Sequence, residues 1–195
     1  MAALPWVEVP EFVDTLAKQT STSARTLELI ILTAVRSGEA RGARWTEFDF
    51  AGRAWTIPAE RMKRGVPHRV PLSEEAIKVL GKVRGLDSEF VFPSASQSKD
   101  GQSRVQSDMV FTSLYKRMGR SGFTTHGFRS SFRDWCSECV HADREIAEAA
   151  LSHATGSAVE RAYARSDLFD RRRKLMDQWG KYVSGEAGNV VSMVG

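Results

Sequence analysis

A ten-residue segment near the N-terminus constrains the fold more than any other part of the chain. Residues 26–35 read Thr-Leu-Glu-Leu-Ile-Ile-Leu-Thr-Ala-Val and would be apolar on nearly every side of a helix. Such a helix must be covered all round by other elements, so it predicts the centre of a domain. It falls well short of the ~20 residues that a membrane span needs, and no signal-peptide pattern precedes it. We expect one cytoplasmic domain without a membrane segment, since 195 residues suffice to bury a core.

Weaker patterns place the remaining elements around this segment. Further helices are expected at residues 9–18, 73–83, 105–118, 126–138, 143–151, 157–164 and 168–183, with Thr125 capping the helix that begins at His126. Three short β-type runs at 47–50, 54–57 and 69–72 predict a small antiparallel sheet, whose second and third strands are joined by a basic turn. We therefore expect an α+β fold, mostly α-helical, over residues 1–183, followed by a flexible tail at 184–195.

Basic residues gather in three places, although the formal net charge is only +4. Residues 36–69 carry eight basic side chains against four acids, residues 104–133 carry six against one, and a third cluster occupies residues 161–174. A basic face attracts polyanions, most commonly a nucleic-acid backbone, although a solvated arginine-rich surface is the simpler explanation of any single cluster. The residues expected to contact DNA are Arg41, Arg44, Arg64, Arg104 and Arg161.

Two arginines stand where a phosphate could be bound. In His126-Gly-Phe-Arg129, a spacing of three puts both side chains on one side of a helix, at an N-terminus whose free N–H groups favour an anion. Arg36 follows the apolar segment, so its guanidinium starts from a partly buried place and needs an anionic partner. Glu39 is one candidate for that partner, and a phosphate held by the planar guanidinium fork is the other.

Three further residues indicate a function only when they are considered together. Lys63 lies in the turn between two expected strands, where a lysine ordinarily just faces water. Tyr163 lies between two alanines in a basic segment. It fits either a half-buried ring with a solvated hydroxyl or an oxygen nucleophile held near His153.

Metal and nucleotide chemistry find little support in the sequence. Cys136, Cys139 and His141 supply three soft ligands, but no second pair completes a closed zinc site, and the two cysteines are interpreted as one turn of a helix. Carboxylates are not paired as in two-metal nucleases, and there is no glycine-rich loop of the P-loop kind. We expect no metal and no cofactor, and two cysteines suit a reducing cytoplasm.

Five segments carry a resemblance to a known family. They are Leu32-Thr-Ala-Val-Arg36-Ser-Gly-Glu39-Ala-Arg-Gly-Ala-Arg-Trp45, Arg61-Met-Lys63, Val70-Pro-Leu-Ser73, His126-Gly-Phe-Arg129, and Leu151-Ser-His153 with Tyr163. In this order they resemble the catalytic domain of the tyrosine recombinases, the phage-integrase family, above all the integrases of prophages and genomic islands. The resemblance spans most of residues 4–183 and implies the DNA breaking-rejoining fold. The N-terminal core-binding domain, which clamps DNA in full-length integrases, is expected to be absent.

The resemblance implies a role for each candidate residue. Two arginines would hold the scissile phosphate, two histidines would complete the site, a mobile hairpin lysine would join them, and a tyrosine would be the nucleophile: Arg36 and Arg129, His126 and His153, Lys63, and Tyr163. Which histidine acts as the base stays open. Ala34 and Ser152 stand where the family commonly has glycine, and we expect these departures to affect packing only.

The function implied is that of a site-specific DNA recombinase that works through a 3′-phosphotyrosine intermediate. Its partner would be double-stranded DNA at attachment sites, bound as a homotetramer by a full-length protein, whereas the isolated domain would be a monomer. Two alternatives remain: a DNA-binding remnant that no longer cuts, and a DNA-relaxing enzyme of the type IB topoisomerase class.

Overall fold

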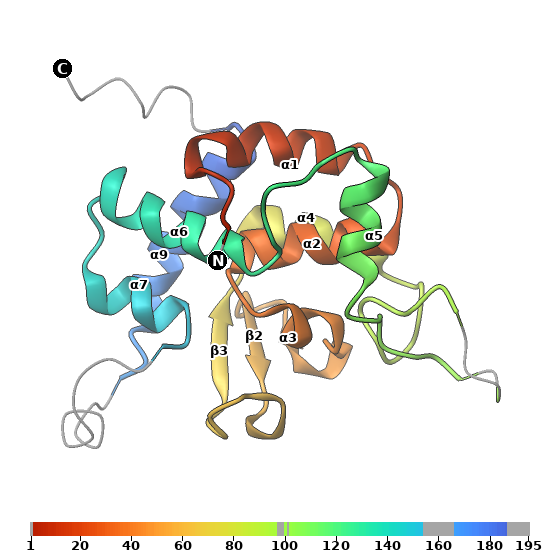
Figure 1. Ribbon diagram of the computed structural model, residues 1–195. Coiled ribbons are helices and arrows are strands. Elements are labelled where there is room, and N and C mark those ends of the chain that lie inside the picture. Colours follow the sequence, from red (N-terminus) through yellow and green to blue (C-terminus); the bar gives the residue numbers. More distant parts are fainter. Residues whose placement is uncertain (1, 97–99, 101, 154–165, 187–195) are drawn as a thin grey trace.

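The computed structural model describes residues 2–96, 100, 102–153 and 166–186 (Figure 1). The helix expected at 157–164, together with Arg161 and Tyr163, lies outside these residues, as does most of the expected tail. The helices are α1 (Val9–Ala17), α2 (Thr22–Thr33), α3 (Ser37–Arg41), α4 (Glu74–Val83), α5 (Val110–Arg117), α6 (Gly127–Glu138), α7 (Arg144–Ala150) and α9 (Phe169–Val183). Short 3-10 turns cover Trp6–Glu8, Trp45–Glu47 and Ala59–Arg61.

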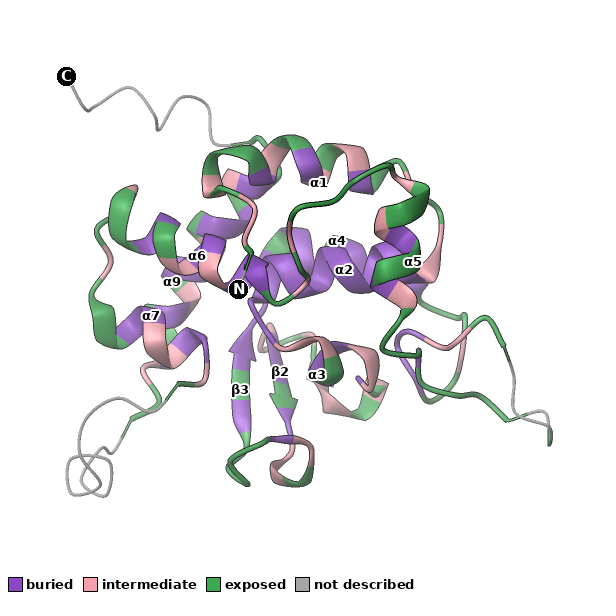
Figure 2. Cartoon of the chain, in the orientation of Figure 1, coloured by how far each residue is buried: buried purple, intermediate pink, exposed green. Residues whose placement is uncertain are grey.

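Helix α2 is the centre of the domain, as its apolar sequence predicts. All its residues from Ser23 to Thr33 are buried, and α1, α3, α4, α5, α6 and α9 pack around it (Figure 2). The helix begins at Thr22, earlier than the expected residue 26, because the Ser21 hydroxyl caps it by accepting from the Ala24 N–H at 3.3 Å. The added turn contains Arg25, a charged residue that does not fit the apolar pattern of the sequence. Its side chain is nevertheless buried, in an ion pair with Glu28 at 2.9 Å.

The predicted antiparallel sheet is confirmed. Within the described residues it has three strands in the order β1 (Phe48–Asp49), β2 (Ala54–Ile57) and β3 (His68–Pro71). Trp55 pairs with Val70 and Ile57 with His68. Strand β1 is shorter than expected because the 3-10 turn takes Glu47. The β2–β3 connection projects from the helical body below α2 in Figure 1.

Two local expectations are wrong. The helix expected from residue 105 begins only at Val110, because Val105 pairs with Pro93 in an isolated β-bridge. The Thr124 hydroxyl, and not that of Thr125, accepts from the N–H of Gly127, the first residue of α6, at 3.1 Å. Thr125 instead bonds the Tyr115 hydroxyl at 2.8 Å. The N-cap position of α6 is His126, which has helical backbone angles and makes no side-chain capping bond.

An aromatic cluster fixes α6 and α9 to the central helix. The Trp135 ring lies 5.0 Å from the Trp179 ring, which meets Phe132 edge-on at 5.4 Å. The Trp179 indole N–H donates to the Ile31 carbonyl of α2 at 2.7 Å. Buried aromatic rings contribute large apolar areas, so this contact stabilises the packing of α6 and α9 against α2. The α+β class is confirmed, and no helix in the described part of the chain is long and apolar enough to cross a membrane.

Candidate active site

Four of the predicted site residues come together where three distant segments meet. Arg36 lies at the junction of α2 and α3, His126 and Arg129 lie at the start of α6, and His153 follows α7. Arg129 Nη2 and His153 Nε2 are 3.1 Å apart. The charges of Arg36 and Arg129 both act on His126. The site is therefore rich in positive charge and in hydrogen-bond donors.

Arg129 is a buried guanidinium without a direct ion pair among the described residues. Its side chain donates to the Ala34 carbonyl, to the Leu151 carbonyl at 2.6 Å and to His153. The residue is only 4% exposed, and its Nε has no hydrogen-bond partner in the described chain. Burial, and next the Arg36 charge, lower the pKa of Arg129 to about 10, so it stays charged at neutral pH. A buried charge with only neutral acceptors is prepared for an anion.

Arg36 has the carboxylate partner that its position requires. Glu39 accepts from the Arg36 backbone N–H at 2.8 Å and from its Nη1 at 3.0 Å, which also caps the start of α3. The Glu39 side chain is buried, whereas that of Arg36 remains 28% exposed. The ion pair thus orients the guanidinium and leaves its outer side accessible to a second anion.

The two histidines differ in how firmly they are held. His153 Nδ1 lies 2.7 Å from Glu148 Oε2, and Glu148 in turn accepts from Arg133 Nε at 2.8 Å. Because an arginine can only donate, His153 Nε2 accepts from Arg129 and the Nδ1 carries the proton. His126 makes no side-chain hydrogen bond with the described residues, and partial burial followed by the charges of Arg129 and Arg36 lowers its pKa.

The expectation that Ala34 and Ser152 affect packing only is wrong. Ala34 has φ 53° and Ser152 has φ 52°, so both adopt the left-handed conformation that favours glycine. The Ala34 carbonyl accepts a hydrogen bond from Arg129. The Leu151 carbonyl, which belongs to the peptide bond between Leu151 and Ser152, also accepts from Arg129. These two strained residues direct the backbone oxygens that hold the buried guanidinium.

Glycine at position 152 is expected to stabilise the fold. Ser152→Gly removes left-handed strain of about 1–2 kcal/mol from the folded state. Glycine also has more conformational entropy in the unfolded state, so the free energy of unfolding should rise by only roughly 0.5–1 kcal/mol. Ala34→Gly should gain less, because burial of the Ala34 methyl group contributes about 0.8 kcal/mol. Urea unfolding measures both changes. Ser152→Ala keeps the strain, so a gain in Ser152→Ala equal to that in Ser152→Gly would contradict the explanation.

Lys63 and Tyr163 are not part of the described cluster. Lys63 is exposed in the β2–β3 connection, next to the buried Met62, and has no ion pair with the described residues. A turn in which the Gly65 N–H donates to the Met62 carbonyl at 3.0 Å shapes the tip. Tyr163 lies outside the described residues, so its place relative to the four assembled side chains remains a prediction.

The arginines expected to contact DNA fall into different environments. Arg64 and Arg104 are exposed, Arg44 pairs with Glu89 beside the Phe90 ring, and Arg161 lies outside the described residues. Arg41 differs: its side chain is 16% exposed, pairs with Asp108 and donates to the Gln106 carbonyl. Its Asp108 partner is 84% exposed, so the pair lies at the surface, and a contact between Arg41 and DNA stays a prediction.

A groove adjoins His126 on the side of α5. It has a volume of about 610 Å³, and its lining includes Lys116, Arg120, Thr124 and His126. Asp108 also lines it, although that carboxylate pairs with Arg41. Basic and hydroxyl side chains are the groups that proteins use to contact a sugar-phosphate backbone.

Two residues near the cluster were missed by the sequence analysis. Glu148 orients His153, and its place on the expected helix 143–151 was the available signal. His68 is buried at the start of β3, where burial and the Arg172 charge lower its pKa to about 4 and keep it neutral. It lies against the backbone of Ala150, and no pattern in the sequence indicated this. In the described residues, no group of three or more His, Cys, Asp or Glu is arranged to hold a metal ion.

Comparison with known proteins establishes the class to which this fold and cluster belong. The chain matches the phage integrase family over residues 4–168, so it belongs to that family. It is 34% identical to prophage integrase IntA of Escherichia coli K12, over 94% of this chain and 45% of that protein. It is 32% identical to the integrase of Enterobacteria phage P4, over 98% of this chain and 47% of that protein. The chain thus spans about half the length of these relatives, and no solved structure matches it significantly.

Proposed function

We propose that this chain is the catalytic domain of a site-specific DNA recombinase that cuts and rejoins strands through a 3′-phosphotyrosine. The observation that carries the proposal is the meeting of Arg36, His126, Arg129 and His153 in a chain of the phage integrase family. Two guanidiniums and two imidazoles can stabilise the negative charge that develops on a phosphodiester under attack. The substrate would be double-stranded DNA at an attachment site.

The two arginines would hold the scissile phosphate in different ways. Arg129 is fixed by neutral acceptors and retains a full charge, so a phosphate oxygen would supply the missing anion. Arg36 is oriented by Glu39 and presents its exposed side. Because both groups are positioned before DNA binds, little reorganisation is needed as charge builds on the phosphate.

The hydrogen bonds favour His126 as the base. Both ring nitrogens of His153 are engaged, by Arg129 and by Glu148, whereas His126 is neutral and its ring makes no hydrogen bond with the described residues. His126 would take the phenolic proton as the Tyr163 oxygen forms a bond to phosphorus. The bond from phosphorus to the 5′-oxygen breaks, and the Lys63 ammonium gives that oxygen a proton. A 5′-hydroxyl of another strand reverses these steps and releases Tyr163.

Contacts away from the cut would come from basic residues outside the cluster. Five residues, Arg41, Arg44, Arg64, Arg104 and Arg161, are proposed to contact DNA phosphates, together with the groove beside His126. A longer recombinase would act as a homotetramer on DNA in the cytoplasm, and this domain alone as a monomer.

A suicide DNA substrate tests the proposal directly. The DNA, taken from the junctions of the source element, carries a nick that lets the cleaved end diffuse away and traps the covalent intermediate. We expect the wild-type chain to form a protein–DNA adduct that survives denaturing electrophoresis, and Tyr163→Phe to form none. Adduct with both proteins, or with neither, would refute the assignment.

The same preparations separate the two alternatives. DNA binding that weakens steeply with salt and is indifferent to Tyr163 and Lys63, without any adduct, would identify a binding remnant. Relaxation of supercoiled plasmid without site preference would identify a topoisomerase.

A further inference from the structure

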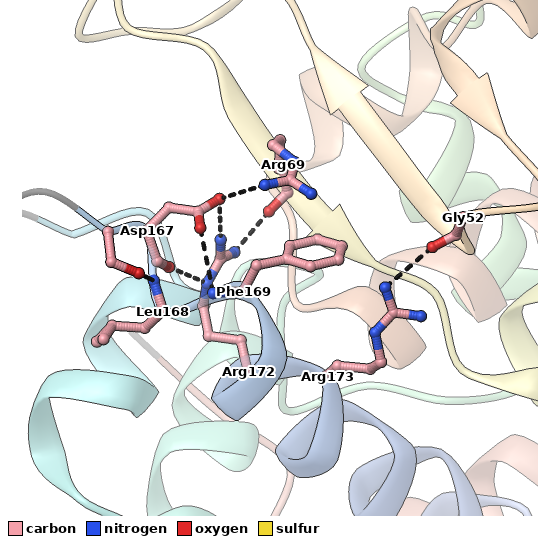
Figure 3. A network of polar contacts seen from close by, with 8 residues as sticks. Gly52, Arg69, Asp167, Leu168, Phe169, Arg172 and Arg173 are labelled. Atoms are coloured by element: carbon pink, nitrogen blue, oxygen red, sulfur yellow. Dashed lines mark hydrogen bonds and ion pairs between the residues drawn. The ribbon is translucent and has the colours of Figure 1, made fainter.

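A buried arginine at the start of α9 joins this helix to the sheet (Figure 3). Arg172 is 1% exposed, yet it uses all three of its nitrogens. Its Nη1 donates to the Arg69 carbonyl of β3 at 2.5 Å. Its Nε and Nη2 donate to the backbone oxygen and the carboxylate of Asp167, at 2.7 and 3.0 Å. One guanidinium therefore ties the chain just before α9 to a strand far away in sequence.

Asp167 completes the connection from the other side. Its Oδ2 also accepts from the Arg69 side chain at 3.4 Å, and its Oδ1 accepts from the Phe169 N–H at 3.1 Å. The Phe169 ring lies under the Arg69 guanidinium, 4.0 Å from ring centre to carbon. Leu168, which lies between Asp167 and Phe169 in the chain, has φ 56°, so the chain turns sharply into α9 at this point. We call Arg69, Asp167 and Arg172 the β3–α9 clamp.

The place of the clamp in the chain gives it a significance beyond stability. Asp167 comes four residues after Tyr163, and Arg69 comes six residues after Lys63. Four residues of chain span at most ~14 Å, so the clamp limits how far a tyrosine at 163 can lie from β3. We propose that the clamp is a positioning device for the nucleophile: it fixes where the segment carrying Tyr163 rejoins the domain. This inference rests on the proposed function.

The chemistry of the clamp suits positioning better than packing. An apolar side chain would fill the same buried volume, but it would not specify the distance between Asp167 and β3. The planar fork of Arg172 specifies that distance through three hydrogen bonds with fixed directions. A shift of about 1 Å in a reacting group can lower a rate by ~10²-fold, so a small displacement of the nucleophile would measurably slow adduct formation.

Asp167→Asn is the informative variant. The Asp167 side chain is 43% exposed. Asparagine keeps its volume and removes the negative charge that Arg69 and Arg172 share. Arg172→Lys keeps the charge but loses the fork. At saturating DNA we expect both variants to form the covalent adduct about 10–100-fold more slowly than wild type, with unchanged DNA affinity.

A neighbouring arginine provides the matched control. Arg173 faces the same Phe169 ring at 4.9 Å and donates to the Gly52 carbonyl at 3.0 Å, but it does not touch Asp167 (Figure 3). Arg173→Lys should form adduct within about twofold of the wild-type rate. Equal slowing of Arg173→Lys and Asp167→Asn would mean that general destabilisation, not positioning, explains the loss, and would overturn the inference.

A sulfur substrate identifies which reacting group has moved. When the leaving 5′-oxygen is replaced by sulfur, departure needs no proton, because a thiol has a pKa near ~8.5. A misplaced nucleophile should remain slow on this substrate. Recovery of Asp167→Asn to the wild-type rate on the sulfur substrate would assign the defect to the lysine hairpin and overturn the inference.

Hydrogen exchange tests the clamp without any need for activity. The amide of Phe169 is bonded to Asp167, and that of Arg172 to the Leu168 carbonyl at 2.9 Å. We expect exchange at residues 166–172 to accelerate at least tenfold in Asp167→Asn and to stay unchanged in Arg173→Lys. Unchanged exchange in Asp167→Asn would refute the clamp even if the wild-type chain cuts no DNA. Absence of wild-type adduct together with faster exchange would refute the recombinase activity, and with it the positioning role, and would leave the clamp as a structural contact.

Discussion

Replacing Arg129 with lysine is expected to slow formation of the covalent tyrosine–DNA adduct by about 10²–10³-fold, the cost of removing one preorganised donor from a charge-stabilising site. A lysine ammonium cannot reach the Ala34 and Leu151 carbonyls together in the fixed directions of the guanidinium. The phosphate would therefore lose a donor held in place before the reaction. Single-turnover adduct formation at saturating DNA measures the effect separately from binding.

Arg53→Lys is the control for Arg129→Lys. Arg53 also donates to a carbonyl, that of Leu72 at 3.1 Å, and pairs with Asp177 at 2.8 Å, but it lies away from the cluster. Its replacement should leave the rate within about twofold of wild type. An Arg129→Lys rate within tenfold of wild type would show that the buried guanidinium is not the phosphate anchor.

Removing the hairpin lysine should slow cleavage in a way that depends on the leaving group. Lys63→Ala is expected to form adduct about 10²–10⁴-fold more slowly on ordinary DNA, the usual contribution of a general acid. On DNA with sulfur at the leaving 5′ position it should approach the wild-type rate, because a thiolate departs without a proton. The two substrates, compared under single-turnover conditions, give the ratio that identifies the proton donor.

The other site variants define the specificity of this rescue. Arg129→Lys should stay slow on the sulfur substrate, since its defect lies at the phosphate and not at the leaving group. If Lys63→Ala remains equally slow on both substrates, the lysine acts by another route, such as DNA contact from the exposed turn.

Elements with strong local patterns were predictable. The apolar run around Ile30 specified a helix covered on all sides, and the spacing of His126 and Arg129 specified a helix start. Their meeting with Arg36 was implied by the family resemblance and not by any local pattern. The structure shows which bonds hold them, from the Ala34 carbonyl to Arg129 and from Arg36 to Glu39.

The remaining features depend on information that a local pattern does not contain. Alanine and serine rarely take a positive φ, so the residues themselves did not indicate a left-handed turn at positions 34 and 152. The available signal was the glycine that the family commonly has at both positions. A count of charges cannot tell that the largely buried Arg41 side chain is paired with Asp108. His68 is buried and meets the backbone of Ala150 in α7, a long-range contact that leaves no periodic trace in the strand.

The bonds of Arg129 have a consequence for when the site first exists. Its acceptors lie 95 residues upstream, at Ala34, and 22 residues downstream, at Leu151. The arrangement that holds Arg129 is therefore absent until the segments that carry Ala34 and Leu151 have both packed against α6. A nascent or half-denatured molecule lacks it, so the proposed DNA cleavage would require the finished tertiary structure.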